Sequence, residues 1–60
     1  MTALWISHPK FTGQVNIDDE DTELTILDTP PVWRAFKGQH LGRLLDWLRS
    51  LGEGLIVEVL

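Results

Sequence analysis

The chain lacks cysteine entirely, and its first residues contain no basic cluster. Without cysteine there are no disulfide bonds, iron–sulfur clusters, thiolate zinc sites or thiol nucleophiles, so we expect a reducing compartment, the cytoplasm. A basic segment opens an export signal, and none is found here. No apolar run approaches the roughly 18 residues that span a bilayer. We therefore expect neither export nor membrane insertion.

The chain also lacks any Lys or Arg between Lys10 and Arg34, and this gap contains its densest group of acids. Residues 18–23 carry five carboxylates in a protein whose formal net charge is −4. Asp28 extends the acidic stretch. Neighbouring carboxylates repel one another by roughly 1 kcal/mol per close pair in water, so the run does not stabilise a fold. Its presence therefore points to a role outside folding.

Length and composition predict one small folded domain covering residues 1–60. A chain of this size buries only about 60% of its unfolded surface, which makes its stability modest. With 43% hydrophobic residues and three tryptophans, the sequence is too apolar for a disordered acidic tail. We expect it to fold without covalent crosslinks.

Period-two patterns predict three strands in the first half of the chain. Residues 3–7 are rich in strand-forming side chains, residues 14–17 alternate polar and apolar, and residues 24–27 resume the apolar pattern. Residues 10–13 read as a turn, so the first two strands are expected to form a hairpin. The acidic run then lies in an exposed connection between the second and third strands.

The second half predicts a helical region. Asp28 and Thr29 precede two prolines, a helix-start signal that places a short helical segment near Pro31 and ends it at Gly38. A second helix is expected over residues 39–51. Leucines at three- and four-residue spacing give it one apolar stripe, formed by Leu41, Leu44, Leu45, Leu48 and Leu51.

A last strand is expected over residues 55–60, after a glycine stop at Gly52. The predicted class is α+β, a small antiparallel or mixed sheet in the order β-β-β-α-β with one amphipathic helix on one face. If the third and fourth strands were parallel, the helix would be their crossover. The last strand is apolar on both sides, which predicts a second apolar surface for a homodimer or a partner.

The inventory of reactive groups argues against an enzyme. Ser7 and Ser50 lack a glycine elbow or a nearby base, and His8 and His40 read as structural imidazoles. Paired carboxylates need a cleft to separate their pKa values, and a 60-residue domain has little room for one. We predict no catalytic residue and no cofactor.

The acidic run does not follow a known metal-binding motif. An EF-hand loop starting at Asp18 would need glycine and a bidentate glutamate where Glu23 and Thr29 stand, so loose calcium or magnesium binding is the only metal alternative, and no metal site is predicted. Net acidity also disfavours direct contact with nucleic acid.

What remains is a protein-binding module. We expect the acidic run to dock onto a basic surface of a partner protein, such as a nucleic-acid-binding groove, because its charge spacing is close to that of a single nucleic-acid strand. Trp47 is the tryptophan most expected to be exposed, Trp5 depends on the sheet face, and Trp33 is expected in the core. The predicted partner-binding residues are Asp18, Asp19, Glu20, Asp21, Glu23, Asp28, Trp47 and Trp5.

In size, acidity and absence of catalytic groups, the chain resembles the small phage-encoded inhibitors of host defence, a class that includes anti-CRISPR proteins and nucleic-acid mimics. That resemblance implies an inhibitor of a host protein and transfers no site residue. The alternative is a structural or assembly subunit that forms homo-oligomers through its spare apolar sheet face, with the acids serving solubility only.

Overall fold

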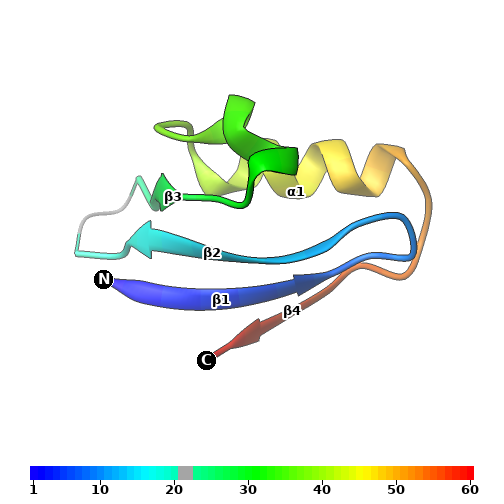
Figure 1. The fold of residues 1–60 in the computed structure, drawn as a ribbon, viewed down its shortest axis with the longest axis horizontal. Coiled ribbons are helices and arrows are strands. Elements are labelled where there is room, and N and C mark those ends of the chain that lie inside the picture. Colours follow the sequence, from blue (N-terminus) through cyan, green and yellow to red (C-terminus); the bar gives the residue numbers. More distant parts are fainter. Residues whose placement is uncertain (21–22) are drawn as a thin grey trace.

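The computed structural model describes residues 1–20 and 23–60. In this part of the chain, two layers are formed by a four-stranded sheet and, over one of its faces, a helical region (Figure 1). The elements in chain order are β1 (Thr2–Ser7), β2 (Thr12–Asp18), β3 (Thr25–Asp28), the 3-10 helix η1 (Pro31–Phe36), α1 (Leu41–Ser50) and β4 (Ile56–Val59). The predicted α+β class and element order are confirmed.

All neighbouring strands are antiparallel, and the sheet order is β3-β2-β1-β4. The first three strands form an antiparallel meander, which contains the predicted hairpin. β4 pairs with β1, so β3 and β4 occupy opposite edges of the sheet. The helical region carries the chain across one face of the sheet from one edge to the other, and α1 is not a crossover between parallel strands.

The β1–β2 hairpin closes over residues 8–11, where His8 and Phe11 exchange two backbone hydrogen bonds of 2.8 and 3.1 Å. Both strands are longer than the sequence pattern indicated. Backbone pairing continues through Thr2 opposite Ile17 and through Ser7 opposite Thr12. The strand ends are thus set by cross-strand hydrogen bonding, which local propensity does not report.

The short helical segment is a 3-10 helix, and Asp28 does not cap it. Its N-cap is Pro30, which forms no side-chain cap, and Trp33 within it has the non-helical angles φ −114° and ψ 17°. The glycine predicted to end the segment, Gly38, has the left-handed φ of 84°, which costs glycine little.

The second helix begins later than predicted because His40 caps it. The His40 Nδ1 atom accepts a hydrogen bond of 2.9 Å from the Gly42 N–H, and the helical residues start at Leu41. Of the predicted stripe, Leu41, Leu44 and Leu48 are buried, whereas Leu45 and Leu51 are half-buried against the core. Across residues 1–20 and 23–60, no helix combines the length and apolar character needed to cross a membrane.

One apolar cluster joins the sheet to the helical region. Residues that alternate along β1 and β2 point to the same side, where they meet one stripe of α1 and the ring of Trp33. The buried members are Leu4, Ile6, Val15, Ile17, Ile26, Trp33, Leu41, Leu44 and Leu48. Trp33 is fully buried, which confirms its predicted place in the core.

The other face of the sheet is uncovered, and β4 is exposed throughout. Val57 and Val59 lie opposite the buried Ile6 and Leu4, so their side chains point to the helical side of the sheet. They are nevertheless 40% and 74% exposed. The core cluster joins α1 to side chains of β1, β2 and β3, and no residue of β4 belongs to it.

Candidate functional site

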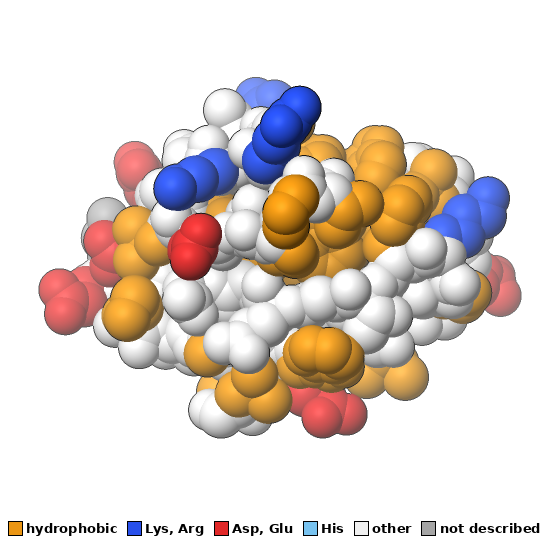
Figure 2. Space-filling view, viewed as in Figure 1, with side chains coloured by type: hydrophobic (Ala, Val, Ile, Leu, Met, Phe, Trp, Pro, Cys, Tyr) orange, Lys and Arg blue, Asp and Glu red, His pale blue; other side chains and the backbone are white. Residues whose placement is uncertain are grey.

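The carboxylates of the β2–β3 connection lie at one end of the sheet. Asp18 ends β2 and is half-buried, and Asp19, Glu20 and Glu23 are exposed. We call Asp18, Asp19, Glu20 and Glu23 the acidic connection; the predicted Asp21 lies outside the described residues. Figure 2 shows Asp and Glu side chains gathered at the left end of the view, over the β2–β3 connection of Figure 1.

Local hydrogen bonds shape this turn. The Asp18 carboxylate accepts a hydrogen bond of 3.1 Å from the Glu20 N–H, a short-range Asx-type contact. Leu24 then adopts the left-handed φ of 46°, unusual for a leucine. Its carbonyl accepts a 3.0 Å hydrogen bond from the Leu41 N–H, and its half-buried side chain packs against the core. The connection is therefore anchored from its β3 side.

Asp19 is held by the start of the chain. The Thr2 hydroxyl donates a hydrogen bond to its carboxylate, and the N-terminal ammonium group of Met1 lies 3.4 Å from its other oxygen. The hydrogen bond from Thr2, followed by weaker contributions that include the N-terminal charge, lowers the pKa of Asp19 below its ordinary value of 3.8. Asp19 therefore stays ionised, and its two carboxylate oxygens are occupied by Thr2 and the N-terminal ammonium group.

Asp28 does not join the acidic connection. It stands at the opposite end of β3, across from Asn16, and its carboxylate accepts a 3.0 Å hydrogen bond from the Thr29 N–H. Three residue steps of about 3.4 Å each place it roughly 10 Å from Thr25. The sequence grouped Asp28 with the run, whereas the strand between them keeps the two apart.

Trp5, and not Trp47, is the more exposed of these two tryptophans. Trp47 is half-buried between the rings of Phe11 and Phe36, at centroid distances of 5.5 and 5.4 Å, so the expectation that it would be the most exposed is wrong. Trp5 is 39% exposed on the uncovered sheet face, between Gln14 and Glu58 of the neighbouring strands. Trp5 is the aromatic side chain available to a partner on that face.

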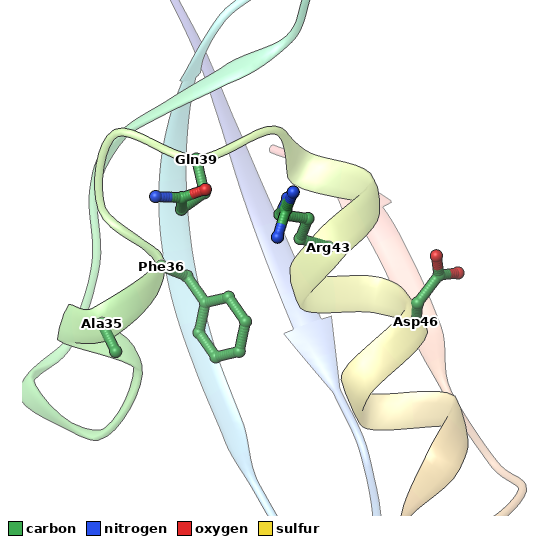
Figure 3. A pocket seen from close by; sticks show the side chains of 5 residues that line it. All are labelled: Ala35, Phe36, Gln39, Arg43 and Asp46. Carbon is green, nitrogen blue, oxygen red and sulfur yellow. The ribbon is translucent and has the colours of Figure 1, made fainter.

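A shallow groove between η1 and α1 was missed by sequence reasoning. It has a volume of about 480 Å³ and is lined by Ala35, Phe36, Gln39, Arg43 and Asp46 (Figure 3). Arg43 and Asp46 are three residues apart on α1, and their spacing alone could have placed them on one helical side. Nothing in the sequence indicated that η1 would fold back beside them.

Both histidines have structural hydrogen bonds. The buried His8 accepts a 3.0 Å bond from the Lys10 N–H through Nδ1, so its proton is on Nε2, which lies 3.2 Å from the Gly52 carbonyl. His8 thereby joins the β1–β2 turn to the α1–β4 loop. His40 caps α1. In the part of the chain that the structure describes, no three Asp, Glu or His side chains are grouped as a metal site.

Comparisons with protein-family models, with curated proteins and with solved structures found no match for this chain.

Proposed function

We propose that this protein is a non-enzymatic binding module whose acidic connection docks onto a basic surface of a partner protein. The observation that supports the proposal is the placement of Asp18, Asp19, Glu20 and Glu23 together at one end of the sheet. Charges concentrated in this way raise association rates and select partners of opposite sign.

The distribution of positive charge supports the same proposal. Arg34, Lys37 and Arg43 are exposed on the helical region, and Figure 2 shows blue side chains along the upper part of the view, one of them near the left end where the red side chains gather. The molecule therefore presents a negative end and a more positive helical side. A basic partner would be attracted to the negative end and turned away from the helical side.

The spacing of the acids indicates the class of basic surface. Consecutive Cα atoms lie about 3.8 Å apart, in a turn as in a strand, and a single nucleic-acid strand carries one charge per roughly 3.4 Å. A groove built to bind nucleic acid would therefore accept the acidic connection in place of phosphates. Bound there, the protein would act as a competitive inhibitor of nucleic-acid binding, and such a role requires no catalytic group.

The test is capture of a partner followed by charge neutralisation. The immobilised protein is exposed to a cell lysate at about 0.05 M and about 0.5 M salt, because screening weakens exposed charge contacts at the higher concentration. A captured protein is identified, purified and titrated against the wild type and the variant D18N/E20Q. Asn at position 18 keeps the acceptor for the Glu20 N–H, so the turn is retained. Asp19 is left intact because it holds Thr2.

A matched control removes the same charge elsewhere. Asp46 and Glu53 are exposed and lie outside the acidic connection, and the variant D46N/E53Q changes the net charge equally. At up to about 1 kcal/mol per exposed ion pair, D18N/E20Q should weaken the complex by up to about 30-fold, and D46N/E53Q should leave it unchanged. A single-stranded oligonucleotide should compete. Equal losses in both variants, or no loss in D18N/E20Q, would refute the proposal.

A further inference from the structure

The two edges of the sheet differ in how their backbone groups are satisfied. At the β3 edge, the Ile26 N–H donates to the Gln39 carbonyl at 2.9 Å, and the Ile26 carbonyl accepts from the Gly38 N–H at 2.8 Å. A bridge between Thr25 and His40 continues this cover. The segment before α1 thus covers the β3 edge, as natural sheets usually require.

The β4 edge has no such cover in the described part of the chain, where β4 neighbours β1 alone. The Leu60 N–H donates to the Ala3 carbonyl at 2.9 Å, and the register places Glu58 opposite Trp5. In an antiparallel pair, hydrogen-bonded residues alternate, so Glu58 bonds inward to β1. The N–H and C=O groups of Val57 and Val59 consequently point outward from the sheet.

The side chains of this edge are as unusual as its backbone. Natural edge strands are protected by lysine, proline or inward-pointing charge, and β4 has one charged residue, Glu58, on the uncovered face. The rest of the segment is apolar and exposed: Ile56 is 56%, Val57 40%, Val59 74% and Leu60 64% exposed. An open ladder with apolar side chains on both faces accepts another β-strand.

We propose that this strand is β4 of a second copy of the same chain, paired antiparallel so that one sheet runs through both molecules. The two-fold axis passes through Val57. Outward-pointing Val57 then pairs with Val57 of the second copy, and Leu55 and Val59 pair with each other across the axis. The outward backbone groups of each copy thereby find partners, as a closed two-fold dimer requires.

Charge selects this register. An axis through Glu58 would place the two Glu58 side chains directly opposite each other, on a non-hydrogen-bonded pair whose Cα atoms lie only about 4.5 Å apart, and like charges there are unfavourable. The axis through Val57 places Glu58 opposite Ile56 instead. An axis through Val59 also avoids the repulsion but pairs less of β4.

The net charge of −4 does not oppose this dimer strongly. The acidic connection joins the two strands farthest from β4, since the order is β3-β2-β1-β4. At about 4.8 Å per strand it lies roughly 12 Å from the β4 edge within each copy, beyond the screening length of about 8 Å at physiological salt. The docking end and the pairing edge are therefore separate surfaces.

The first experiment measures mass against concentration by light scattering after gel filtration. The wild type should shift from monomer to dimer as its concentration rises. Val59→Lys places a charge at the edge where the monomer leaves valine exposed, and it should weaken the dimer about tenfold or more. Circular dichroism should show the same fold. A wild type that stays monomeric at every concentration would overturn the proposal. The β4 edge would then be open or be covered by a different chain.

A proline pair tests the backbone directly. Val57→Pro removes an N–H that points outward, so it should abolish dimerisation and keep β4 on β1. Glu58→Pro removes an N–H directed to β1 and should disrupt β4 even in the monomer. A Val57→Pro variant that still forms dimers would exclude pairing through the β4 edge.

Single cysteines test the register, because the chain has none of its own. With the axis through Val57, the variant V57C brings two Cα atoms to about 5.5 Å, within the range that a disulfide bridges. V57C should crosslink under mild oxidation, and E58C should not. Faster crosslinking of E58C than of V57C would overturn the assigned register.

Discussion

Gly13 provides the most direct test of how closely the helical region approaches the sheet. It lies in β2 opposite Ile6, on the covered face. A Cβ atom added there would stand 2.8 Å from Cγ of Pro30 and 3.2 Å from Cζ3 of Trp33. Real Cβ contacts are not that short, so a proline ring or a fully buried indole has to move.

The sign and size of Gly13→Ala follow from two opposing effects. Replacing glycine by alanine reduces the freedom of the unfolded chain and stabilises by about 0.4–1 kcal/mol where the backbone permits. Overpacking a filled core costs about 1–3 kcal/mol. Trp33 is fully buried and Pro30 is rigid, so the steric cost should win by about 1–2 kcal/mol. In a domain of this size the melting temperature should fall by roughly 10 °C.

Urea denaturation followed by tryptophan fluorescence measures this loss. The matched control is Thr12→Ala at the exposed neighbouring position, which should change the free energy of unfolding by less than about 0.5 kcal/mol. A second variant, Pro30→Ala, removes the closest atom. The double variant G13A/P30A should then be more stable than the sum of the single losses predicts, by about 1 kcal/mol. A Gly13→Ala protein as stable as the wild type, or strict additivity with Pro30→Ala, would refute this close packing of Pro30 and Trp33 on Gly13.

Three further predictions concern the ends of the sheet. Because the pKa of Asp19 is lowered in the folded state, the ionised carboxylate stabilises the fold fully above about pH 3.8, and this stabilisation is lost as the pH falls through the folded pKa. Asp19→Asn should therefore be less stable than the wild type at pH 7, and the difference in free energy of unfolding should shrink in an acid titration. A difference that stays constant with pH would contradict the role of Thr2. Leu24→Gly should be about 1 kcal/mol more stable than Leu24→Ala in urea, because only glycine adopts φ 46° without strain, and the opposite order would exclude that backbone geometry. His8→Ala should lower the free energy of unfolding by about 2 kcal/mol, because two hydrogen bonds are removed. His8→Asn retains an acceptor for the Lys10 N–H and should lower it less. Equal losses in the two variants would show that only the packing of His8 matters.

The order of strands and helices could be predicted from the sequence because each element carries a local signal. The leucine stripe of residues 41–51 repeats at helical spacing, and β1 and β2 alternate at strand spacing. Element ends were harder to predict, since the helix begins at Leu41 rather than at residue 39 and β2 begins before its alternation is evident. The strand ends depend on cross-strand hydrogen bonds and the helix start depends on the His40 cap, and periodicity reports neither.

The candidate site was predicted in part for the same reason. Asp18, Asp19 and Glu20 are neighbours along the chain, so any fold keeps them close. Asp28 is separated from them by β3, and Trp47 is enclosed by Phe11 from a turn far away in sequence. The contact between Trp47 and Phe11 arises only when the helical region folds back onto the sheet.

By itself, the sequence determined the α+β class, the amphipathic helix, the absence of thiol chemistry and the concentration of acids before β3, because composition and spacing along the chain are sufficient for each. Tertiary structure alone decided that the sheet is wholly antiparallel, that β3 has a covered edge while β4 has an open one, and which tryptophan faces solvent. These features depend on which strands become neighbours, and neighbourhood is set by long-range pairing and by burial of one shared core.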